Sequence, residues 1–378
     1  MQGERAFIAS AFAAIAVSFG IGRYGIGLFL PDMARDFQLS EAQLGYLASA
    51  GWAGYVASSI VSMVVTKALG ARTLVVSGLV TAAVGMALIA AAQSSHVLVA
   101  GAILTGVSPG LVFAPLADAV TALFTAQRRG PAFAKINAGE GAGAIAAGLF
   151  FLVVGGRDWR WAWTAFAILA IVAAAAVSMN IPRRSAVADL PQDLKPTWST
   201  LIERRAWPLL SGAFVIGAST TVLWTYASVL VDGKTFAGLE LRVVLWIIMG
   251  AAGVAAIAVA PILETYGLRR TYAASIVVTS VSAIALALAA EAPLAALVAG
   301  AIFGFAYIMI TSQIGTWSLV LWPNMPAAGF GFTFLVFSAG AVAGPAAAGA
   351  ATGTITLAAA LAITGLITAG VLALLPGE

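Results

Sequence analysis

Four ionisable residues lie within long apolar stretches of this sequence: Arg23, Asp118, Lys135 and Glu140. A charged side chain at the centre of a membrane-spanning helix costs about 3 kcal/mol or more unless it is paired or faces water. Such residues therefore mark candidate binding sites, proton pathways or buried ion pairs. All four lie in the N-terminal half of the chain, so we expect the charged part of a functional site in that half.

Arg23 is the candidate anchor for an anion. Its guanidinium stays protonated and presents a planar fork of donors, which matches a carboxylate, phosphate or sulfate with two hydrogen bonds. We expect the adjacent Tyr24 to belong to the same site. The alternative is a structural ion pair with Glu140 that fastens two helices together.

Glu140 is the candidate proton-coupling group. It follows Pro131 by nine residues, which places it about 13 Å into a helix, near the middle of a membrane. Burial disfavours the charged carboxylate, which suits this group to bind and release a proton near neutrality. Asn137, one turn earlier, shares its helix face and is a predicted substrate contact. A structural hydrogen-bonded acid is the alternative.

Asp118 and Lys135 are predicted near one membrane surface, on either side of the basic pair Arg128-Arg129. Both are close enough to the interface for their charged ends to reach water. A salt bridge between the ends of their two helices is the favoured interpretation.

The C-terminal half offers polar and aromatic residues in place of charges. Thr221 and Trp224 lie on one helical face of an apolar stretch, together with Gly217 and Ser228. A second stretch carries Tyr307, Thr311, Gln313 and Trp317. Hydrogen bonds and ring faces for a substrate are one interpretation, and ordinary helix packing is the other. Four tryptophans near the ends of stretches are predicted to lie in the interfacial aromatic belt: Trp159, Trp161, Trp163 and Trp322.

The composition identifies a membrane protein. Of 378 residues, 61% are hydrophobic and 9% are charged, against about 25% charged in soluble domains; the mean hydropathy is +1.01. There is no Cys and one His, which disfavours disulfides, metal clusters, catalytic triads and an integral membrane enzyme. We expect neither a cofactor nor a bound metal. A net charge of +4 without basic runs does not indicate nucleic-acid binding.

Twelve apolar stretches are long enough to cross a bilayer as helices. They are residues 6–30, 42–66, 74–93, 96–122, 132–155, 161–181, 207–231, 240–262, 271–290, 293–318, 329–351 and 353–375. The predicted fold is an all-α integral membrane protein with twelve transmembrane helices in two six-helix halves. The halves are residues 1–181 and 207–378, joined by a polar cytoplasmic linker at 182–206.

Basic residues predict the orientation. With both termini in the cytoplasm, the inner segments hold twelve Lys and Arg residues and the outer segments hold five. The excess of positive charge on the cytoplasmic side supports this orientation.

Two short loops repeat at an offset of 197 residues. The first reads KALGAR and contains Lys67, Gly70 and Arg72, whereas the second reads ETYGLRR and contains Glu264, Gly267, Arg269 and Arg270. The same offset relates Gly143 to Gly340. Parallel six-helix repeats are one known construction of alternating-access transporters.

In its twelve spans, central basic linker and paired basic loops, the sequence resembles the major facilitator superfamily. The resemblance implies that spans 1, 4, 7 and 10 line a central cavity, and that the two loops form inner gates in which Asp118 pairs with Arg72. It also implies a monomer. Lys67 departs from the family pattern, because an acid belongs at its position. Simple anchoring of helix ends by Arg72 and Arg269 is the alternative. Residues 20–31, GIGRYGIGLFLP, resemble a signature of the YbfB/YjiJ-like subgroup.

These observations predict a secondary active transporter of the cytoplasmic (inner) membrane that works by alternating access. Glu140 predicts coupling to protons, and Arg23 predicts a small organic anion as substrate. The alternative is proton-coupled efflux of amphipathic drugs, in which Glu140 would face a cation and Arg23 would be structural. No Gly-x-x-x-x-Gly-Lys-(Ser/Thr) loop for ATP is present.

Overall fold

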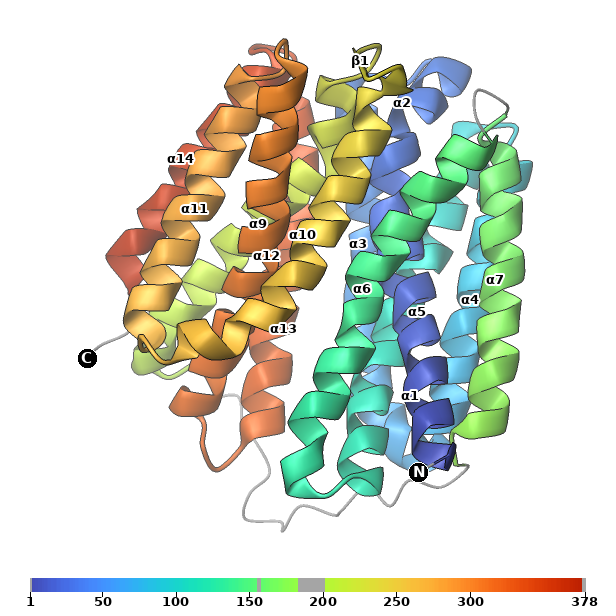
Figure 1. The fold of residues 1–378 in the computed structure, drawn as a ribbon, viewed down its shortest axis with the longest axis vertical. Helices are drawn as coiled ribbons and strands as arrows, with labels where there is room; N and C mark the ends of the chain where they lie inside the picture. The colour runs from blue at the N-terminus through green and yellow to red at the C-terminus, as the bar shows by residue number, and fades with distance from the viewer. Residues whose placement is uncertain (1, 155–157, 183–200, 376–378) are drawn as a thin grey trace. The chain divides into compact units, whose positions relative to one another are not determined.

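The chain folds almost entirely into helices (Figure 1). The computed structural model describes residues 2–154, 158–182 and 201–375. Two compact units divide the chain, Met1–Val187 and Ala188–Glu378. Most of the predicted linker, residues 182–206, lies outside the described residues.

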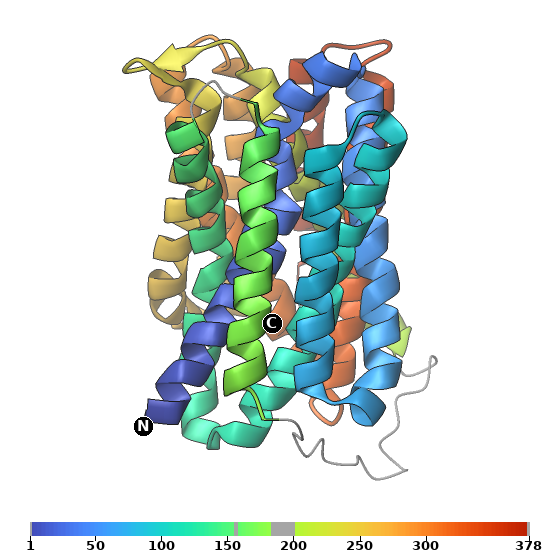
Figure 2. The same ribbon diagram turned by 90° about the vertical axis from the view of Figure 1, so that its right-hand side faces the viewer.

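The described residues of the first unit form eight helical elements, which make six spans. They are α1 (Gln2–Ile15), the π-helix η1 (Ala16–Tyr24), α2 (Gly25–Phe37), α3 (Glu41–Leu69), α4 (Ala71–Ala91), α5 (Ser95–Leu123), α6 (Ala126–Val154) and α7 (Arg160–Asn180). The elements α1, η1 and α2 run on as one apolar span, Gly3–Phe37. Helix α7 packs beside α4, as Figure 2 shows.

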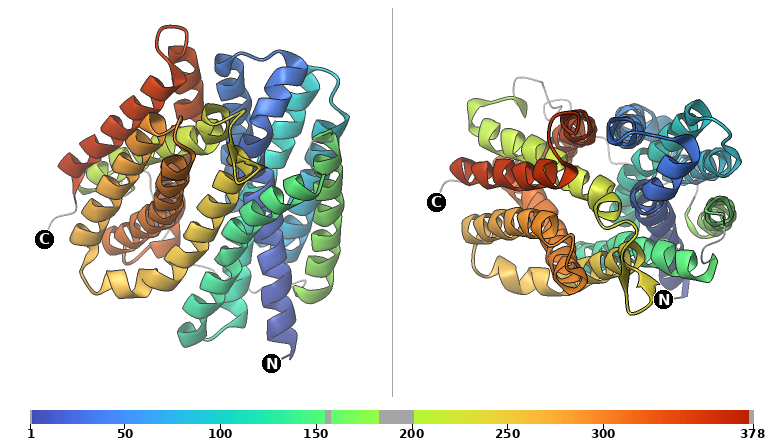
Figure 3. Two further views of the ribbon diagram at one scale, coloured as in Figure 1. Left: turned by 45° about the horizontal axis from the view of Figure 1, so that its top comes forward. Right: turned by 90° about the horizontal axis from the view of Figure 1, so that it is seen from above.

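The described residues of the second unit form six further spans. Its elements are η3 (Arg204–Ala206), α9 (Trp207–Leu230), β1 (Thr235–Phe236), β2 (Leu239–Glu240), α10 (Leu241–Glu264), α11 (Leu268–Leu288), α12 (Pro293–Leu321), α13 (Pro326–Ala351), α14 (Leu357–Gly370) and η4 (Val371–Leu374). The two strands, each two residues long, form a hairpin directly before α10 (Figure 3). Ala237 and Gly238 make its turn with φ of 51° and 80°, as the right-handed twist of a tight hairpin requires.

The predicted fold class is confirmed. Among the described residues, eleven helices are long and apolar enough to cross a membrane, and the twelfth span is α10, whose described apolar part is Leu241–Ala256. Each helical span pairs its backbone N–H and C=O groups within itself, as a chain in lipid requires.

The π-helix η1 was not predicted from the sequence. It widens the first span over nine residues, Ala16–Tyr24, where the glycine-rich stretch packs against α6. A Cβ atom added at Gly20 would overlap the backbone oxygen of Glu140 and lie 2.5 Å from the Cα of Gly143. Wide π turns inside α-helices often occur at functional sites, and this one carries Arg23 and Tyr24.

The same close packing recurs in the second unit, where α9 lies against α13. A Cβ atom at Gly217 would overlap the backbone oxygen of Phe337, just as one at Gly20 would overlap that of Glu140. Gly217 follows Gly20, and Phe337 follows Glu140, by 197 residues, which is the offset found in the sequence. Phe337 therefore occupies the position of Glu140, so the second unit has no carboxyl group at the equivalent place.

The two repeated loops share one backbone conformation. Gly70 has φ 78° and ψ 155°, and Gly267 has φ 83° and ψ 150°. This region is accessible essentially to glycine alone. Each glycine is the residue directly before a helix, α4 or α11, so the loop turns sharply between two spans.

Substitution of Gly267 by Ala is expected to destabilise the protein through backbone strain alone. A Cβ atom there would meet no other atom within 4 Å, so the cost is the strained φ, about 1–3 kcal/mol. Thermal unfolding of the purified protein in detergent measures it. Gly130→Ala, inside α6 and equally open, should leave the midpoint unchanged or raise it. Equal midpoints for the two variants would refute the assignment of strain.

The aromatic-belt prediction is wrong for three of the four tryptophans. Trp163 is fully buried and packs on Phe29, and Trp159 and Trp322 are also buried. Only Trp161 is largely exposed. Trp163 of α7 packs on Phe29, and Trp159, directly before α7, packs on Phe37 and donates to Asp36, so both rings lie inside their own unit.

Candidate functional site

The Arg23 side chain lies among four aromatic rings of the first unit. The carbon at the centre of its guanidinium is 3.5 Å from the centre of the Trp52 ring, 4.8 Å from that of Tyr55, 5.2 Å from that of Phe19 and 5.3 Å from that of Tyr24. A cation over an aromatic face within about 6 Å is attracted by the ring quadrupole, by about 2 kcal/mol when water is excluded. We call these four rings the aromatic cage.

Beside the cage, Tyr24 joins the first span to α6. Its hydroxyl donates a 2.7 Å hydrogen bond to Oε1 of Glu140. Tyr24 is 3% exposed, and Glu140 is partly buried. The Arg23 charge also acts electrostatically on the Glu140 carboxyl group. The structure therefore brings three predicted site residues together: Arg23, Tyr24 and Glu140.

Glycine contacts set this arrangement. Gly139 and Gly143 of α6 face the first span, and a Cβ atom at Gly139 would lie 2.5 Å from the backbone oxygen of Phe12. Small residues spaced four apart let two helix backbones approach closely. Glu140 follows Gly139 directly, so this approach brings its carboxyl group within reach of the Tyr24 hydroxyl.

The chemistry available here is reversible binding of charge. The faces of a guanidinium suit ring stacking while its N–H donors point outwards in its plane, where they can meet a carboxylate. Arg23 is partly exposed, which gives water access to it. Asn137, also partly exposed, lies one turn before Glu140 on α6. Among the described residues there is no group of three or more His, Asp and Glu that could hold a metal.

In the second unit, Trp224 and Tyr307 are brought together. Their ring centres are 5.7 Å apart, and Trp224 also packs edge-on against Trp246 at 5.3 Å and Phe303 at 5.7 Å. Trp246 was missed in the sequence because it stands among apolar residues of α10. Its indole nitrogen is buried and donates to no described residue.

The other predicted residues of this unit do not join that cluster. Trp317 packs on Tyr272 at 5.4 Å. The hydroxyls of Thr221 and Thr311 donate to backbone oxygens of their own helices, those of Gly217 and Tyr307. Their oxygens can therefore serve a ligand as acceptors. Gln313 is 6% exposed, and its Oε1 accepts no hydrogen bond from a described residue.

Two expected ion pairs are not formed among the described residues: Asp118 with Arg72 at the first repeated loop, and Asp118 with Lys135 between two helix ends. No described residue makes an ion pair with Arg72, Asp118 or Lys135. Lys135 is exposed, and Asp118 and Arg72 are partly so, which lets water solvate their charges. The predicted gate residues Lys67 and Glu264 have side chains outside the described part of the chain.

Other ion pairs fasten the ends of the spans, and sequence spacing gave no signal for them. Asp36 accepts hydrogen bonds from the Trp159 indole at 2.9 Å and from Arg160 at 2.6 Å. Arg160 also donates to the backbone oxygen of Ala92 at 3.1 Å. At the other end of the unit Arg128 pairs with Glu4 at 3.0 Å. These contacts join residues more than sixty positions apart and fasten the first span to α6 and α7, and α7 to the end of α4.

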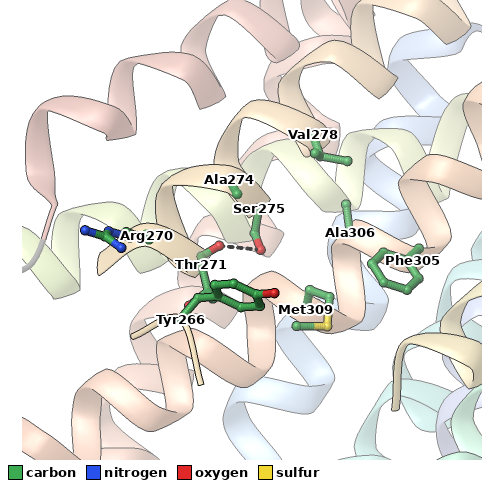
Figure 4. A pocket seen from close by; sticks show the side chains of 9 residues that line it. All are labelled: Tyr266, Arg270, Thr271, Ala274, Ser275, Val278, Phe305, Ala306 and Met309. Carbon is green, nitrogen blue, oxygen red and sulfur yellow. Dashed lines mark hydrogen bonds between the residues drawn. The ribbon is translucent and has the colours of Figure 1, made fainter. Parts of the chain in front are cut away.

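A pocket of about 380 Å³ opens between α11 and α12 in the second unit. Arg270 and Tyr266 lie towards one end, and Phe305 lies towards the other (Figure 4). Ser275 lines it too, but its hydroxyl donates to the Thr271 backbone oxygen at 2.9 Å. None of its nine lining residues was predicted to bind substrate.

Curated proteins resemble parts of this chain. Monocarboxylate transporter 13 of Rattus norvegicus is 31% identical over 157 residues, which cover 41% of this chain and 36% of that protein. The uncharacterized transporter YgaY of Escherichia coli O157:H7 is 27% identical over 217 residues, which cover 55% of this chain and 53% of that protein. The chain thus spans about half the length, or less, of these relatives.

Solved structures share the fold over nearly the whole chain. A bacterial homologue of the human lysosomal transporter Spinster, inward-facing and unoccupied, matches with a TM-score of 0.73 and 15% identity, covering 98% of this chain and 94% of that one. A point mutant of the nucleoside transporter NupG matches with a TM-score of 0.76 and 13% identity, covering 98% and 97%.

The decisive comparison is with a sequence family. The model of the Major Facilitator Superfamily matches residues 12–345. This confirms the predicted family and the expectation that the chain is not an enzyme. The chain is a multi-pass membrane protein that belongs to the major facilitator superfamily of transporters.

Proposed function

We propose that this protein is a proton-coupled secondary transporter of a small organic anion, working by alternating access. The observation that carries the proposal is the position of Arg23. It lies 3.5 Å from the Trp52 ring, next to the hydrogen bond between Tyr24 and Glu140. This arrangement combines a permanent cation for the substrate with a carboxyl group for the proton.

The partial relatives support the same substrate class. One of them is named a monocarboxylate transporter, and a monocarboxylate is the simplest anion that the Arg23 fork would bind with two hydrogen bonds. In this proposal Asn137 contributes a hydrogen bond in the first unit. Trp224, Tyr307, Thr221, Thr311, Gln313 and Trp317 supply ring faces and polar groups from the second.

Further parts of the proposal follow from the sequence. The protein lies in the cytoplasmic membrane with both termini inside, since twelve basic residues then lie on the inner side and five on the outer. The resemblance to the family favours a monomer. The units correspond to residues 1–181 and 207–378, and residues 20–31 relate the chain to the YbfB/YjiJ-like subgroup. The loops with Arg72 and Arg269 act as inner gates, in which Arg72 meets Asp118 in another conformational state.

Uptake into proteoliposomes tests this function. Purified protein should accumulate radiolabelled lactate or pyruvate when a pH gradient is imposed, and unlabelled monocarboxylates should compete. A thermal-stability screen with carboxylates, sulfonates, phosphates, sugars and cationic drugs should show stabilisation by anions, because binding to the folded state raises stability. Stabilisation of the wild type by cationic drugs alone would overturn the proposal in favour of drug efflux.

Replacing Glu140 by Gln is expected to uncouple transport from protons. The amide is nearly isosteric and can still accept from Tyr24, but it cannot bind and release a proton. Exchange of labelled for unlabelled anion should persist, while accumulation driven by a pH gradient should fall to the level of empty vesicles. The matched control is Glu4→Gln, which removes an acid from the same unit, in the first turn of α1. Gradient-driven accumulation by Glu140→Gln at the wild-type rate would show that another group carries the proton.

A further inference from the structure

The surroundings of Arg23 have the composition of a site for an organic cation. Four rings face its guanidinium at 3.5 to 5.3 Å, and the Glu140 carboxyl group is held beside them by Tyr24. Aromatic rings arranged around a point, with a carboxylate near by, are the usual means by which proteins hold alkylammonium ions. Here the protein's own side chain occupies that point.

The cage is built independently of Arg23. Phe19 and Tyr55 pack edge-on at 6.2 Å, and Tyr55 packs edge-on against Trp52 at 5.9 Å. Phe19 also packs on Phe113 of α5 at 5.7 Å. Phe19, Tyr24 and Trp52 are all buried. Because these rings hold one another, the cage should persist when the arginine is removed.

The charge of Glu140 determines which ligand could bind in the cage once Arg23 is removed. With Arg23 present, its positive charge lies near the Glu140 carboxyl group and acts on it. Without Arg23, the carboxyl group keeps the hydrogen bond from the Tyr24 hydroxyl but loses the nearby positive charge. A small cation in the cage would restore the balance and would fill the space left by the guanidinium.

We propose that Arg23 occupies, within the molecule, a site fitted to an organic cation, and that this occupancy sets the charge of the transported ligand. With Arg23 in place the site presents a guanidinium and takes an anion. Without it the same rings and Glu140 take a small guanidinium or quaternary ammonium ion. The statement that the site takes an anion when Arg23 is present rests on the proposed function, whereas the cation site does not.

The test uses the full-length Arg23→Ala variant and two probes, guanidinium and tetramethylammonium, each at millimolar concentration. Calorimetric titration should show binding to the variant at least about 10-fold tighter than to the wild type, the change expected when a cation gains desolvated ring contacts. Sodium at the same concentration serves as the ionic-strength control and should not compete.

Two double variants locate the binding. Arg23→Ala with Trp52→Ala removes the nearest ring, and Arg23→Ala with Glu140→Gln removes the charge. Both should lose most of the gain in cation binding. If Arg23→Ala does not stay folded in detergent, Arg23→Gln provides the neutral variant with a polar side chain, and the same titrations apply.

The outcomes separate this inference from the proposed function. If the neutral variant binds neither probe more tightly than the wild type does, or if removal of Trp52 leaves its binding unchanged, the cation site is refuted. If the variant binds both probes while the wild type binds no anion, the cation site stands and the anion-transport proposal fails.

Discussion

Replacement of Arg23 by Ala is expected to reduce anion binding by about 100-fold or more. A charge-assisted pair of hydrogen bonds to a carboxylate contributes about 3 kcal/mol, which corresponds to that factor. Arg23→Lys keeps the charge but loses the planar fork and the stacking on Trp52, so we expect an intermediate loss of about 10-fold. Calorimetric titration of lactate into the purified proteins measures both dissociation constants.

A matched control removes a different positive charge from the same span. Arg35 lies in the last turn of α2, where it pairs with Asp32 one turn earlier. Arg35→Ala should leave the dissociation constant of the anion within about 2-fold, since an exposed pair contributes little. Comparable losses in the Arg35 and Arg23 variants would point to net charge rather than to the guanidinium site.

Replacement of Gly143 by Ala is expected to destabilise the protein by about 3 kcal/mol or more. The added Cβ atom would overlap the backbone oxygen of Ala16 and lie 2.8 Å from the Cα of Gly20. Backbone atoms cannot rotate out of the way, so the first span and α6 must separate, which places the cost at the upper end of the range for overpacking. Separation would also lengthen the hydrogen bond between Tyr24 and Glu140. Thermal unfolding in detergent measures the loss of stability. Gradient-driven uptake reports the functional effect of the longer Tyr24–Glu140 hydrogen bond.

Two comparisons make that result specific. Gly130→Ala lies on the same helix with no atom within 4 Å of the new Cβ, and it should be neutral or slightly stabilising because Ala favours the helix. Gly340→Ala, the equivalent change in the second unit, would overlap the backbone oxygen of Phe214. It should destabilise to a similar extent but leave the Tyr24–Glu140 contact intact. An unfolding midpoint of Gly143→Ala equal to that of Gly130→Ala would contradict the close approach of the two helices.

The fold class could be read from the sequence because the bilayer imposes it locally. A run of about 20 apolar residues must be helical whatever its neighbours are, and this holds for spans such as α4 and α7. The loop repeat was also readable, since Gly70 and Gly267 hold a conformation that essentially only glycine adopts. The sequence did not reveal the π-helix at Ala16–Tyr24, because its glycines suit an ordinary close-packed helix equally well.

The sequence by itself determined that the chain crosses the membrane many times and that two charges within its spans, Arg23 and Glu140, lie in the N-terminal half. Hydropathy and the cost of a charge in lipid are properties of single residues and short runs, so spacing suffices to find them. Only the tertiary structure decided what surrounds those charges. Trp52 and Tyr55 enclose Arg23, and Tyr24 reaches Glu140, because backbone contacts between glycines set the register of one helix against another. That register depends on both helices together and cannot be read from either one alone.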